Sequence, residues 1–269
     1  MTPKQLRITD IHRMKADGRR IVMTTCYDAL FARLLDESDV DLLLVGDSVE
    51  EVLAGSDTTL SATLEQMIYH AKAVCRGVRR ALVVCDLPFL TYQVSIARAV
   101  ENAGRVMQET GCDAVKLEGG RSRAEAIRAL VDAGIPVMGH LGLTPQSIHV
   151  LGGHRVQGRG NEAISRLQDD ALAVQEAGAF ALVLELVTAP VATQITQRLE
   201  IPTIGVGAGP GCDGQVLVMH DLLGLTESFE ARFVKHYAAL GEDVRRAARQ
   251  YAADVRSGSF PASEHSFAE

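Results

Sequence analysis

Residues 64–86 read LEQMIYHAKAVCRGVRRALVVCD, and this stretch decides the fold class because two structural periods meet in it. Its first part repeats apolar residues at the i, i+3, i+4, i+7 spacing of a helix that packs on a sheet. Those residues are Leu64, Met67, Ile68, Ala71, Val74, Cys75 and Val78. Thr63 and Gln66 have the spacing of a capping box at the start of this helix. The run ALVVCD (81–86) is typical of a buried strand, so the stretch predicts one helix-to-strand step of a parallel sheet.

The same alternation extends along the chain in both directions and gives eight strand-like runs. They are IVMTT (21–25), DLLLVG (41–46), ALVVCD (81–86), AVKLE (114–118), PVMGH (136–140), ALVLE (181–185), PTIGVG (202–207) and QVLVMHD (215–221). Ser122 and Glu125 predict a second capping box. Gly111, Gly134 and Gly178 each come just before a strand, where the end of a helix needs a positive φ.

Eight strands with intervening crossovers favour a closed (β/α)8 TIM barrel, which is an α/β fold. An open doubly wound sheet stays a live alternative, because a sequence does not show closure. The 269 residues are close to the ~250 of a single barrel. No Pro-, Ser- or charge-rich linker divides the chain. We therefore expect a single catalytic barrel domain over residues 1–269.

Composition excludes several classes of partner. The chain carries 27 Lys and Arg against 34 Asp and Glu, only 4% aromatic residues and no Trp, which argues against nucleic acid. No apolar run approaches the ~18 residues of a membrane span, and the charged N-terminus lacks the apolar core of a signal peptide. The five cysteines form no CxxC pair, so we expect buried, inert thiols and a cytoplasmic location.

Polar residues stand at the ends of five consecutive predicted strands. They are Asp47, Asp86, Glu118, His140 and Glu185. In a barrel these carboxyl-terminal ends surround one mouth, where catalytic residues of this fold gather. Alternation along a strand adds Lys116, which points to the same side as Glu118. The pattern predicts an active site at this mouth.

The acidic character of this set indicates a metal ion. A lone Asp after a strand is more often a turn former or helix cap, and a lone His is often structural. Clustered carboxylates, however, repel one another unless a cation lies among them. Mg²⁺ prefers one or two carboxylates together with substrate oxygens and water, and no Cys/His cluster favours zinc. The same ion would attract an anionic substrate.

Two Gly-rich segments lie outside this set of polar residues. Gly209, Gly211 and Gly214 match GxGxxG, but a strand-like run follows them where a dinucleotide site needs a helix, so we interpret them as a tight turn. The segment from Leu143 to Glu162 is long and Gly-rich and follows the fifth strand. Its length and position predict a lid over the mouth.

Several motifs resemble one enzyme family. They are VGDS (45–48), DLPF (86–89), KLEGG (116–120), GHLGLTPQS (139–147), GGHRVQGRG (152–160), LVLE (182–185) and DGQVLVMHD (213–221). In this order they resemble the ketopantoate hydroxymethyltransferases, which are 3-methyl-2-oxobutanoate hydroxymethyltransferases of pantothenate synthesis. The resemblance implies a barrel of the phosphoenolpyruvate/pyruvate superfamily, Mg²⁺ or another divalent ion, 5,10-methylenetetrahydrofolate as carbon donor, and a homodecamer.

The resemblance also implies roles for residues that match the motifs. Asp47 and Asp86 look like direct metal ligands that also contact the substrate, and Glu118 looks like an outer ligand acting partly through water.

The remaining matches concern the substrate. Ser48 and Lys116 look like contacts to the carboxylate of the 2-oxo acid, His140 looks like a partner for substrate oxygens, and Glu185 looks like the general base. The implied reaction is addition of a hydroxymethyl group to the enolate of 3-methyl-2-oxobutanoate, giving ketopantoate.

The chain departs from the family after GDS. It has Val49, Glu50 and Glu51 where the family usually has Leu, Gly and then Met or Asn, and Ser56 where His or Tyr is frequent. The two added carboxylates either face solvent, which we favour, or disfavour a polyanionic folate tail. A superfamily lyase remains an alternative, although the lid segment has no Cys to act as its general acid. A catalytically silent barrel is a second alternative.

Overall fold

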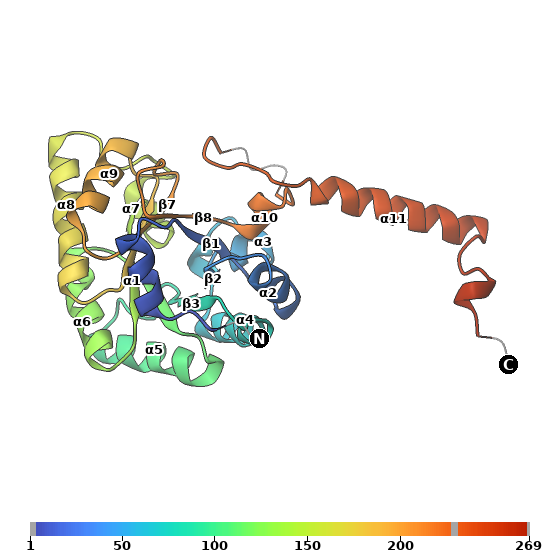
Figure 1. Ribbon diagram of the computed structural model, residues 1–269, viewed down its shortest axis with the longest axis horizontal. Coiled ribbons are helices and arrows are strands. Elements are labelled where there is room, and N and C mark those ends of the chain that lie inside the picture. The colour runs from blue at the N-terminus through green and yellow to red at the C-terminus, as the bar shows by residue number, and fades with distance from the viewer. Residues whose placement is uncertain (1–3, 227–230, 268–269) are drawn as a thin grey trace. The chain divides into compact units, whose positions relative to one another are not determined.

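The computed structural model describes residues 4–226 and 231–267, and these divide into two compact units, one before and one after the boundary between residues 218 and 219. The first unit is a closed barrel of parallel strands in the order β1 to β8, with β8 pairing back to β1 (Figure 1). Closure confirms the predicted (β/α)8 barrel and excludes the open doubly wound sheet. The expectation of one domain over the whole chain stays a prediction.

Each of the eight predicted strands forms at its predicted place. The strands are β1 (Ile21–Thr25), β2 (Leu42–Val45), β3 (Leu82–Asp86), β4 (Ala114–Glu118), β5 (Val137–Gly142), β6 (Ala181–Glu185), β7 (Thr203–Val206) and β8 (Gly214–Leu217). The predicted eighth strand, residues 215–221, is longer than the strand that forms. The strand ends at Leu217, and Met219–Leu222 forms the short helix α10, because an apolar run of this length does not distinguish a strand from a helical turn.

Helices follow the strands and lie around the outside of the barrel (Figure 1). In the first unit they are α1 (Ile8–Ala16), α2 (Ala29–Asp36), α3 (Val49–Val52), α4 (Leu64–Gly77), α5 (Ile96–Thr110), α6 (Ala124–Asp132), α7 (Ile148–Leu151), α8 (Asn161–Glu176) and α9 (Ala189–Arg198). Three short 3-10 helices are η1 (Thr59–Ser61), η2 (Arg121–Arg123) and η3 (Pro145–Ser147). Both η3 and α7 lie in the predicted lid segment, whose motion stays a prediction.

The predicted helix ends are mostly correct. The capping box of Thr63 and Gln66 is present at the start of α4. The second box, Ser122 with Glu125, is wrong, because η2 occupies Arg121–Arg123 and α6 begins after it without a side-chain cap. The three glycines expected at positive φ have it. Their φ values are 77° at Gly111, 82° at Gly134 and 97° at Gly178.

The alternation of side chains along each strand directs the polar residues of the predicted site toward the barrel axis. Leu82 and Val84 of β3 belong to the central apolar cluster of the barrel, and so does Ala114 of β4. Successive side chains of a strand point to opposite faces, so the same alternation turns Asp86, Lys116 and Glu118 toward the barrel axis. Their apolar neighbours, such as Leu117, face the outer helices. Each buried Leu, Ile or Met contributes roughly 1.5–3 kcal/mol, which holds this register in place.

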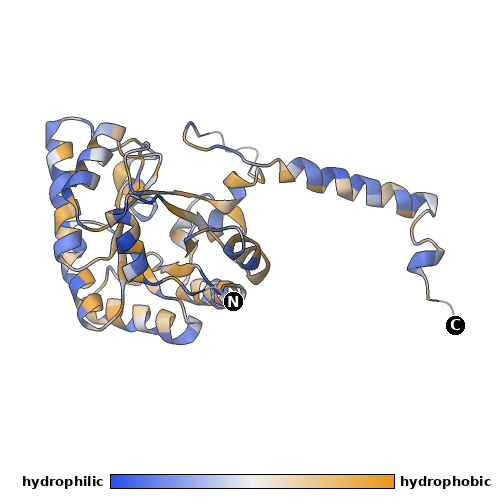
Figure 2. Ribbon diagram, in the orientation of Figure 1, coloured by the Kyte–Doolittle hydropathy of each residue, from blue (hydrophilic) through white to orange (hydrophobic). Residues whose placement is uncertain are grey.

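The second unit contains α10, α11 (Leu240–Ser257) and η4 (Ser263–His265). Helix α11 has no buried residue and is largely hydrophilic, with hydrophobic residues spaced along it (Figure 2). Among the residues that the structure describes, no helix combines the length and the apolar character needed to cross a membrane.

Candidate active site

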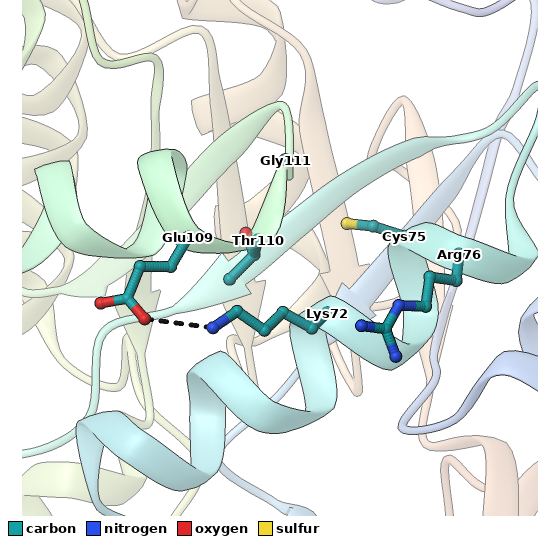
Figure 3. Close-up of a pocket in the computed structure, with 6 residues that line it drawn as sticks. All are labelled: Lys72, Cys75, Arg76, Glu109, Thr110 and Gly111. Atoms are coloured by element: carbon teal, nitrogen blue, oxygen red, sulfur yellow. Dashed lines mark hydrogen bonds and ion pairs between the residues drawn. The ribbon is translucent and has the colours of Figure 1, made fainter.

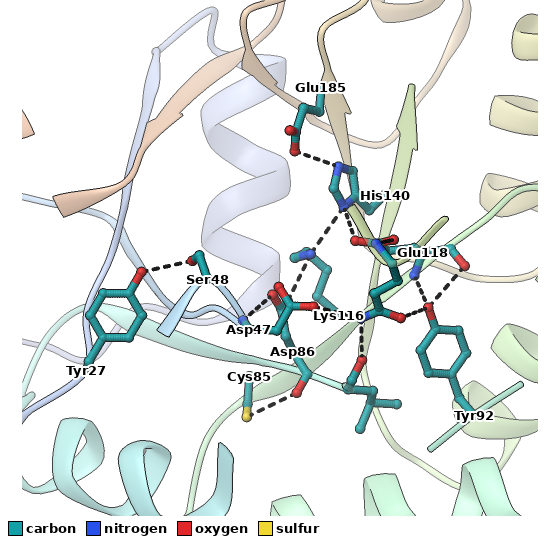
Figure 4. A network of polar contacts seen from close by, with 12 residues as sticks. Tyr27, Asp47, Ser48, Cys85, Asp86, Tyr92, Lys116, Glu118, His140 and Glu185 are labelled. Atoms are coloured by element: carbon teal, nitrogen blue, oxygen red, sulfur yellow. Dashed lines mark hydrogen bonds and ion pairs between the residues drawn. The ribbon is translucent and has the colours of Figure 1, made fainter. Parts of the chain in front are cut away.

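The polar residues predicted at the strand ends meet at the mouth of the barrel (Figure 4). A connected set of contacts joins Asp47, Asp86, Lys116, Glu118, His140 and Glu185. They come from five consecutive strands, as the parallel topology requires, and all but Glu185 are buried.

Asp47 and Asp86 lie side by side at the ends of β2 and β3. The backbone N–H of Asp47 donates to Oδ2 of Asp86 at 3.1 Å. Burial raises the pKa of Asp47 well above its usual range, and the charges of Asp86 and Glu118 raise it further. Burial also raises the pKa of Asp86, although Lys116 opposes this effect. Gly46 comes directly before Asp47, and its lack of a side chain matters because a Cβ at this position would lie 2.8 Å from Oγ of Ser48.

Lys116 supplies a positive charge inside the mouth. Its Nζ lies 2.9 Å from Oδ1 of Asp86 and 3.3 Å from Nδ1 of His140. Burial lowers the pKa of this ammonium, but the carboxylates of Asp86, Glu118 and Asp47 together raise it above its ordinary value. The amine therefore stays protonated.

His140 lies between two glutamates. Nδ1 is 3.4 Å from Oε1 of Glu118, and Nε2 is 3.2 Å from Oε2 of Glu185. Burial and the charge of Lys116 lower the pKa of the imidazole, and the two glutamates raise it more, to about 9. The ring is therefore cationic at neutral pH in the metal-free protein.

The donor set of the mouth fits a hard divalent cation. The neighbouring charges of Asp86 and Glu118 disfavour the ionised form of Asp47, and a divalent cation among these carboxylates would relieve that repulsion. The buried Oδ1 of Asp86 makes its ion pair with Lys116 but accepts no well-directed hydrogen bond, so it has capacity for a further partner. Among the residues described, no three His, Cys, Asp or Glu side chains form a ready-made metal site. Two carboxylates completed by substrate and water oxygens are a coordination that Mg²⁺ favours.

Glu118 is placed differently from the two aspartates. Its Oε1 faces His140, and its Oε2 accepts a hydrogen bond from the backbone N–H of Gln146 at 3.0 Å. Both oxygens therefore already have protein partners. This arrangement suits the outer, water-mediated role that the family resemblance implies better than direct coordination.

Ser48 lies at the edge of the cluster. It precedes α3, and its Oγ shares a 2.9 Å hydrogen bond with the hydroxyl of Tyr27. Burial raises the pKa of Tyr27, so its phenol remains protonated. The carbonyl of Tyr27 is held in turn by Nδ1 of His70 on α4 at 2.7 Å.

Our sequence reasoning missed three residues of the network: Tyr27, Tyr92 and Gln146. They follow β1, β3 and β5, so their positions after strands were a usable signal. Tyr92 and Gln146 also stand just outside DLPF and inside GHLGLTPQS, two motifs that carry the family resemblance. Neutral hydrogen-bonding side chains after a strand mark a site less clearly than charged ones, because they are also common in ordinary turns.

The two glutamates that depart from the family pattern differ from each other. Glu51 is exposed, which agrees with the predicted solvent-facing position. Glu50 is not. It is 5% exposed, and its carboxylate accepts hydrogen bonds from Ser56, Ser61 and Gln66 at 3.2, 2.8 and 2.7 Å. The solvent-facing interpretation is therefore wrong for Glu50, because α3 turns this side chain toward η1 and the start of α4.

A separate groove lies on the outer layer, between the last turns of α4 and α5 (Figure 3). It is lined by Lys72, Cys75, Arg76, Glu109, Thr110 and Gly111. An ion pair of 3.1 Å joins Lys72 and Glu109 across it. Burial raises the pKa of Cys75 to about 12, so the protonated thiol predominates at neutral pH. All five cysteines are free, and the expected burial is confirmed for four of them, Cys75 being only partly buried; their inertness stays a prediction.

The barrel and its acidic mouth define a class of (β/α)8 enzymes. Phosphonopyruvate hydrolase, solved in a complex with oxalate and Mg²⁺, superposes with a TM-score of 0.66 at 10% identity, over 97% of this chain and 93% of that one. The 2,3-dimethylmalate lyase, a phosphoenolpyruvate mutase/isocitrate lyase superfamily member, has a TM-score of 0.59 at 18% identity, over 97% and 91% of the chains. At these identities the likeness concerns the fold.

Sequence comparison defines the family. A family model described as "Ketopantoate hydroxymethyltransferase" matches residues 5–263. The 3-methyl-2-oxobutanoate hydroxymethyltransferase of Syntrophotalea carbinolica is 55% identical over 264 residues, covering 98% of this chain and 99% of the relative. That of Nitratidesulfovibrio vulgaris is 57% identical over 254 residues, covering 94% and 83%. The chain belongs to the ketopantoate hydroxymethyltransferase family and is an enzyme that transfers a hydroxymethyl group.

Proposed function

We propose that this enzyme transfers a hydroxymethyl group from 5,10-methylenetetrahydrofolate to 3-methyl-2-oxobutanoate and so makes ketopantoate. The observation that carries the proposal is the mouth itself, where two adjacent buried aspartates, a buried ammonium and a His–Glu pair converge. The names of the relatives support the acceptor and the product.

Asp47 and Asp86 would hold Mg²⁺, with Glu118 acting through water. When bound, the ion supplies Lewis acidity at the keto oxygen of the substrate, an effect worth several kcal/mol in related chemistry. Other divalent ions with oxygen preference fit the same donors.

Lys116 and Ser48 bind the substrate carboxylate in this proposal. Lys116 offers a buried positive charge, and the hydroxyl of Ser48 lies at the same mouth. The buried Nε2 of His140 makes an ion pair with Glu185 but no well-directed hydrogen bond. Its N–H is therefore available to donate to a substrate oxygen.

Glu185 acts as the general base and removes the proton from C3 of the oxo acid. It is less buried than the other carboxylates, with 21% of its side chain exposed, so a substrate entering the mouth reaches it. The cationic ring of His140 orients this carboxylate. A positioned base of this kind contributes ~10²–10⁴-fold. The enolate carbon then bonds to the methylene carbon of the donor as one of its two C–N bonds opens. Water adds its oxygen to the same carbon as the second C–N bond breaks, and tetrahydrofolate leaves with two protons, one from C3 of the oxo acid and one from water.

Hydrogen–deuterium exchange tests the proposal without the folate donor. In D₂O with Mg²⁺, the enzyme is expected to exchange the C3 proton of 3-methyl-2-oxobutanoate for deuterium. Proton NMR measures this exchange as loss of the C3 proton signal. Glu185→Gln should abolish exchange and leave binding of the oxo acid largely intact, as measured by calorimetry. A wild-type enzyme that binds the oxo acid but exchanges no proton would refute the proposed base.

The homodecameric assembly, the cytoplasmic location and the folate donor belong to the same proposal. A decamer would have a mass close to ten times the 28.9 kDa of the chain, which light scattering measures directly.

A further inference from the structure

We propose that Gln146 is a positioning residue that sets the carboxylates of Asp47 and Glu118 for a divalent cation. It does so from η3, at the start of the Leu143–Glu162 segment, so the order of that segment and the affinity for the cation are coupled. This inference rests on the proposed function, because it assumes that the mouth binds a divalent ion. Gln146 is 6% exposed and, in the part of the chain that the structure describes, its side chain and backbone N–H contact five other residues in the mouth.

The amide of Gln146 has one orientation. Its Oε1 accepts hydrogen bonds from the hydroxyl of Tyr92 at 2.7 Å and from Nε2 of Gln93 at 3.0 Å. Both partners are placed as donors, so the oxygen must face them and the NH₂ group must face the other way. The hydroxyl of Tyr92 is itself fixed, because it accepts the backbone N–H of Glu118 at 3.1 Å.

The NH₂ group of Gln146 uses both of its hydrogens. Nε2 donates to Oδ2 of Asp47 at 2.9 Å and to the carbonyl of Leu87 at 2.9 Å. The carbonyl of Leu87 belongs to the residue after Asp86, so one amide ties the ends of β2 and β3 together. With Oδ2 held in this way, rotation of the Asp47 carboxylate is restricted.

The backbone of Gln146 holds a second carboxylate. Its N–H donates to Oε2 of Glu118 at 3.0 Å. This N–H is in the first turn of η3, where a helix leaves its amides without internal partners, and Pro145 begins that turn. Gln146 thus reaches Asp47 with its side chain and Glu118 with its main chain.

A neutral amide is suited to this position. An acidic residue would add charge to a mouth that already has an excess of carboxylates, and a cationic residue would compete with the metal ion. The amide orients Asp47 without changing the charge. Groups that orient metal ligands in this way typically affect metal affinity or activity by 10–100-fold.

Binding of Mn²⁺, a paramagnetic substitute for Mg²⁺, tests the inference by electron paramagnetic resonance. Gln146→Met keeps the volume and removes the amide, and we expect the dissociation constant for Mn²⁺ to rise about 10-fold or more. Gln168→Met is the matched control, because the amide of Gln168 donates to Gln194 on the outer helices. Its Mn²⁺ affinity should equal that of the wild type.

The outcomes separate the two proposals. A wild-type enzyme that binds no Mn²⁺, with or without oxo acid, contradicts the metal site and with it the proposed function. A wild type that binds Mn²⁺, together with a folded Gln146→Met that binds it within threefold of the wild type, overturns only the inference. If Gln146→Met does not fold, Tyr92→Phe decides, because it removes the hydroxyl that orients the amide. A several-fold weaker Mn²⁺ affinity in Tyr92→Phe supports the inference, and an unchanged affinity overturns it.

Discussion

Replacement of Lys116 by Met should destabilise the metal-free enzyme strongly and the Mg²⁺-loaded enzyme much less. The ammonium lies 2.9 Å from Asp86, and both side chains are at most 5% exposed. Removal of one partner of a buried ion pair leaves an uncompensated charge and costs ~3–5 kcal/mol. For a chain of this size, 1 kcal/mol shifts Tm by roughly 2–4 °C, so the expected loss in EDTA is about 6–20 °C.

Saturating Mg²⁺ should restore a large part of this loss, because a divalent ion between Asp47 and Asp86 compensates the same charge. Thermal unfolding, followed by circular dichroism in EDTA and in Mg²⁺, gives the difference in Tm between variant and wild type in each condition. The control is Lys15→Met. Lys15 pairs with Asp213 at 2.8 Å in a partly buried site at the other end of the barrel. The decrease in Tm caused by Lys15→Met should therefore be the same in EDTA and in Mg²⁺. A Lys116→Met protein whose deficit is equal in EDTA and Mg²⁺ would show that the two aspartates do not share a cation.

Three further predictions concern single groups. Glu50→Ala should lower the free energy of unfolding by ~1–3 kcal/mol in urea denaturation, since it removes the buried carboxylate that accepts three hydrogen bonds, whereas Glu51→Ala should have little effect. In the metal-free protein, NMR should show His140 titrating near pH 9, above the ordinary pKa of 6.5. The stability that the protonated ring contributes to the folded state is therefore fully present below pH 6.5 and is lost as the pH rises through 9. Thiol-specific reagents at pH 8 should leave Cys26 unmodified in the folded protein, because burial raises its pKa to about 12; rapid labelling before unfolding would contradict this.

Much of the candidate site follows from position along the chain. Asp86, Glu118 and Glu185 each end an apolar run, and Asp47 follows one closely. Parallel strands of a closed barrel all end at the same mouth, so residues separated by tens of positions must meet there once the barrel is assumed. The period-2 rule likewise placed Lys116 beside Glu118 without coordinates.

Other features depended on contacts that no local pattern encodes. Gln146 and Asp47 are 99 residues apart, and Gln146 and Tyr92 are 54 apart, yet each pair forms a buried hydrogen bond. The burial of Glu50 depends on where η1 and α4 return to α3. Neutral amides and hydroxyls occur throughout surface loops as well as in sites, so composition did not single these residues out.

The amino-acid sequence by itself determined the eight strands, the side of each strand that faces the axis, and the family to which the chain belongs, because these depend on local periodicity and on ordered motifs. Only the tertiary structure decided closure of the barrel, the end of β8 at Leu217 and the partners of each carboxylate. Those depend on distances between segments remote in the chain, and the hydrogen bonds and charges that fix them exist only once the barrel has formed.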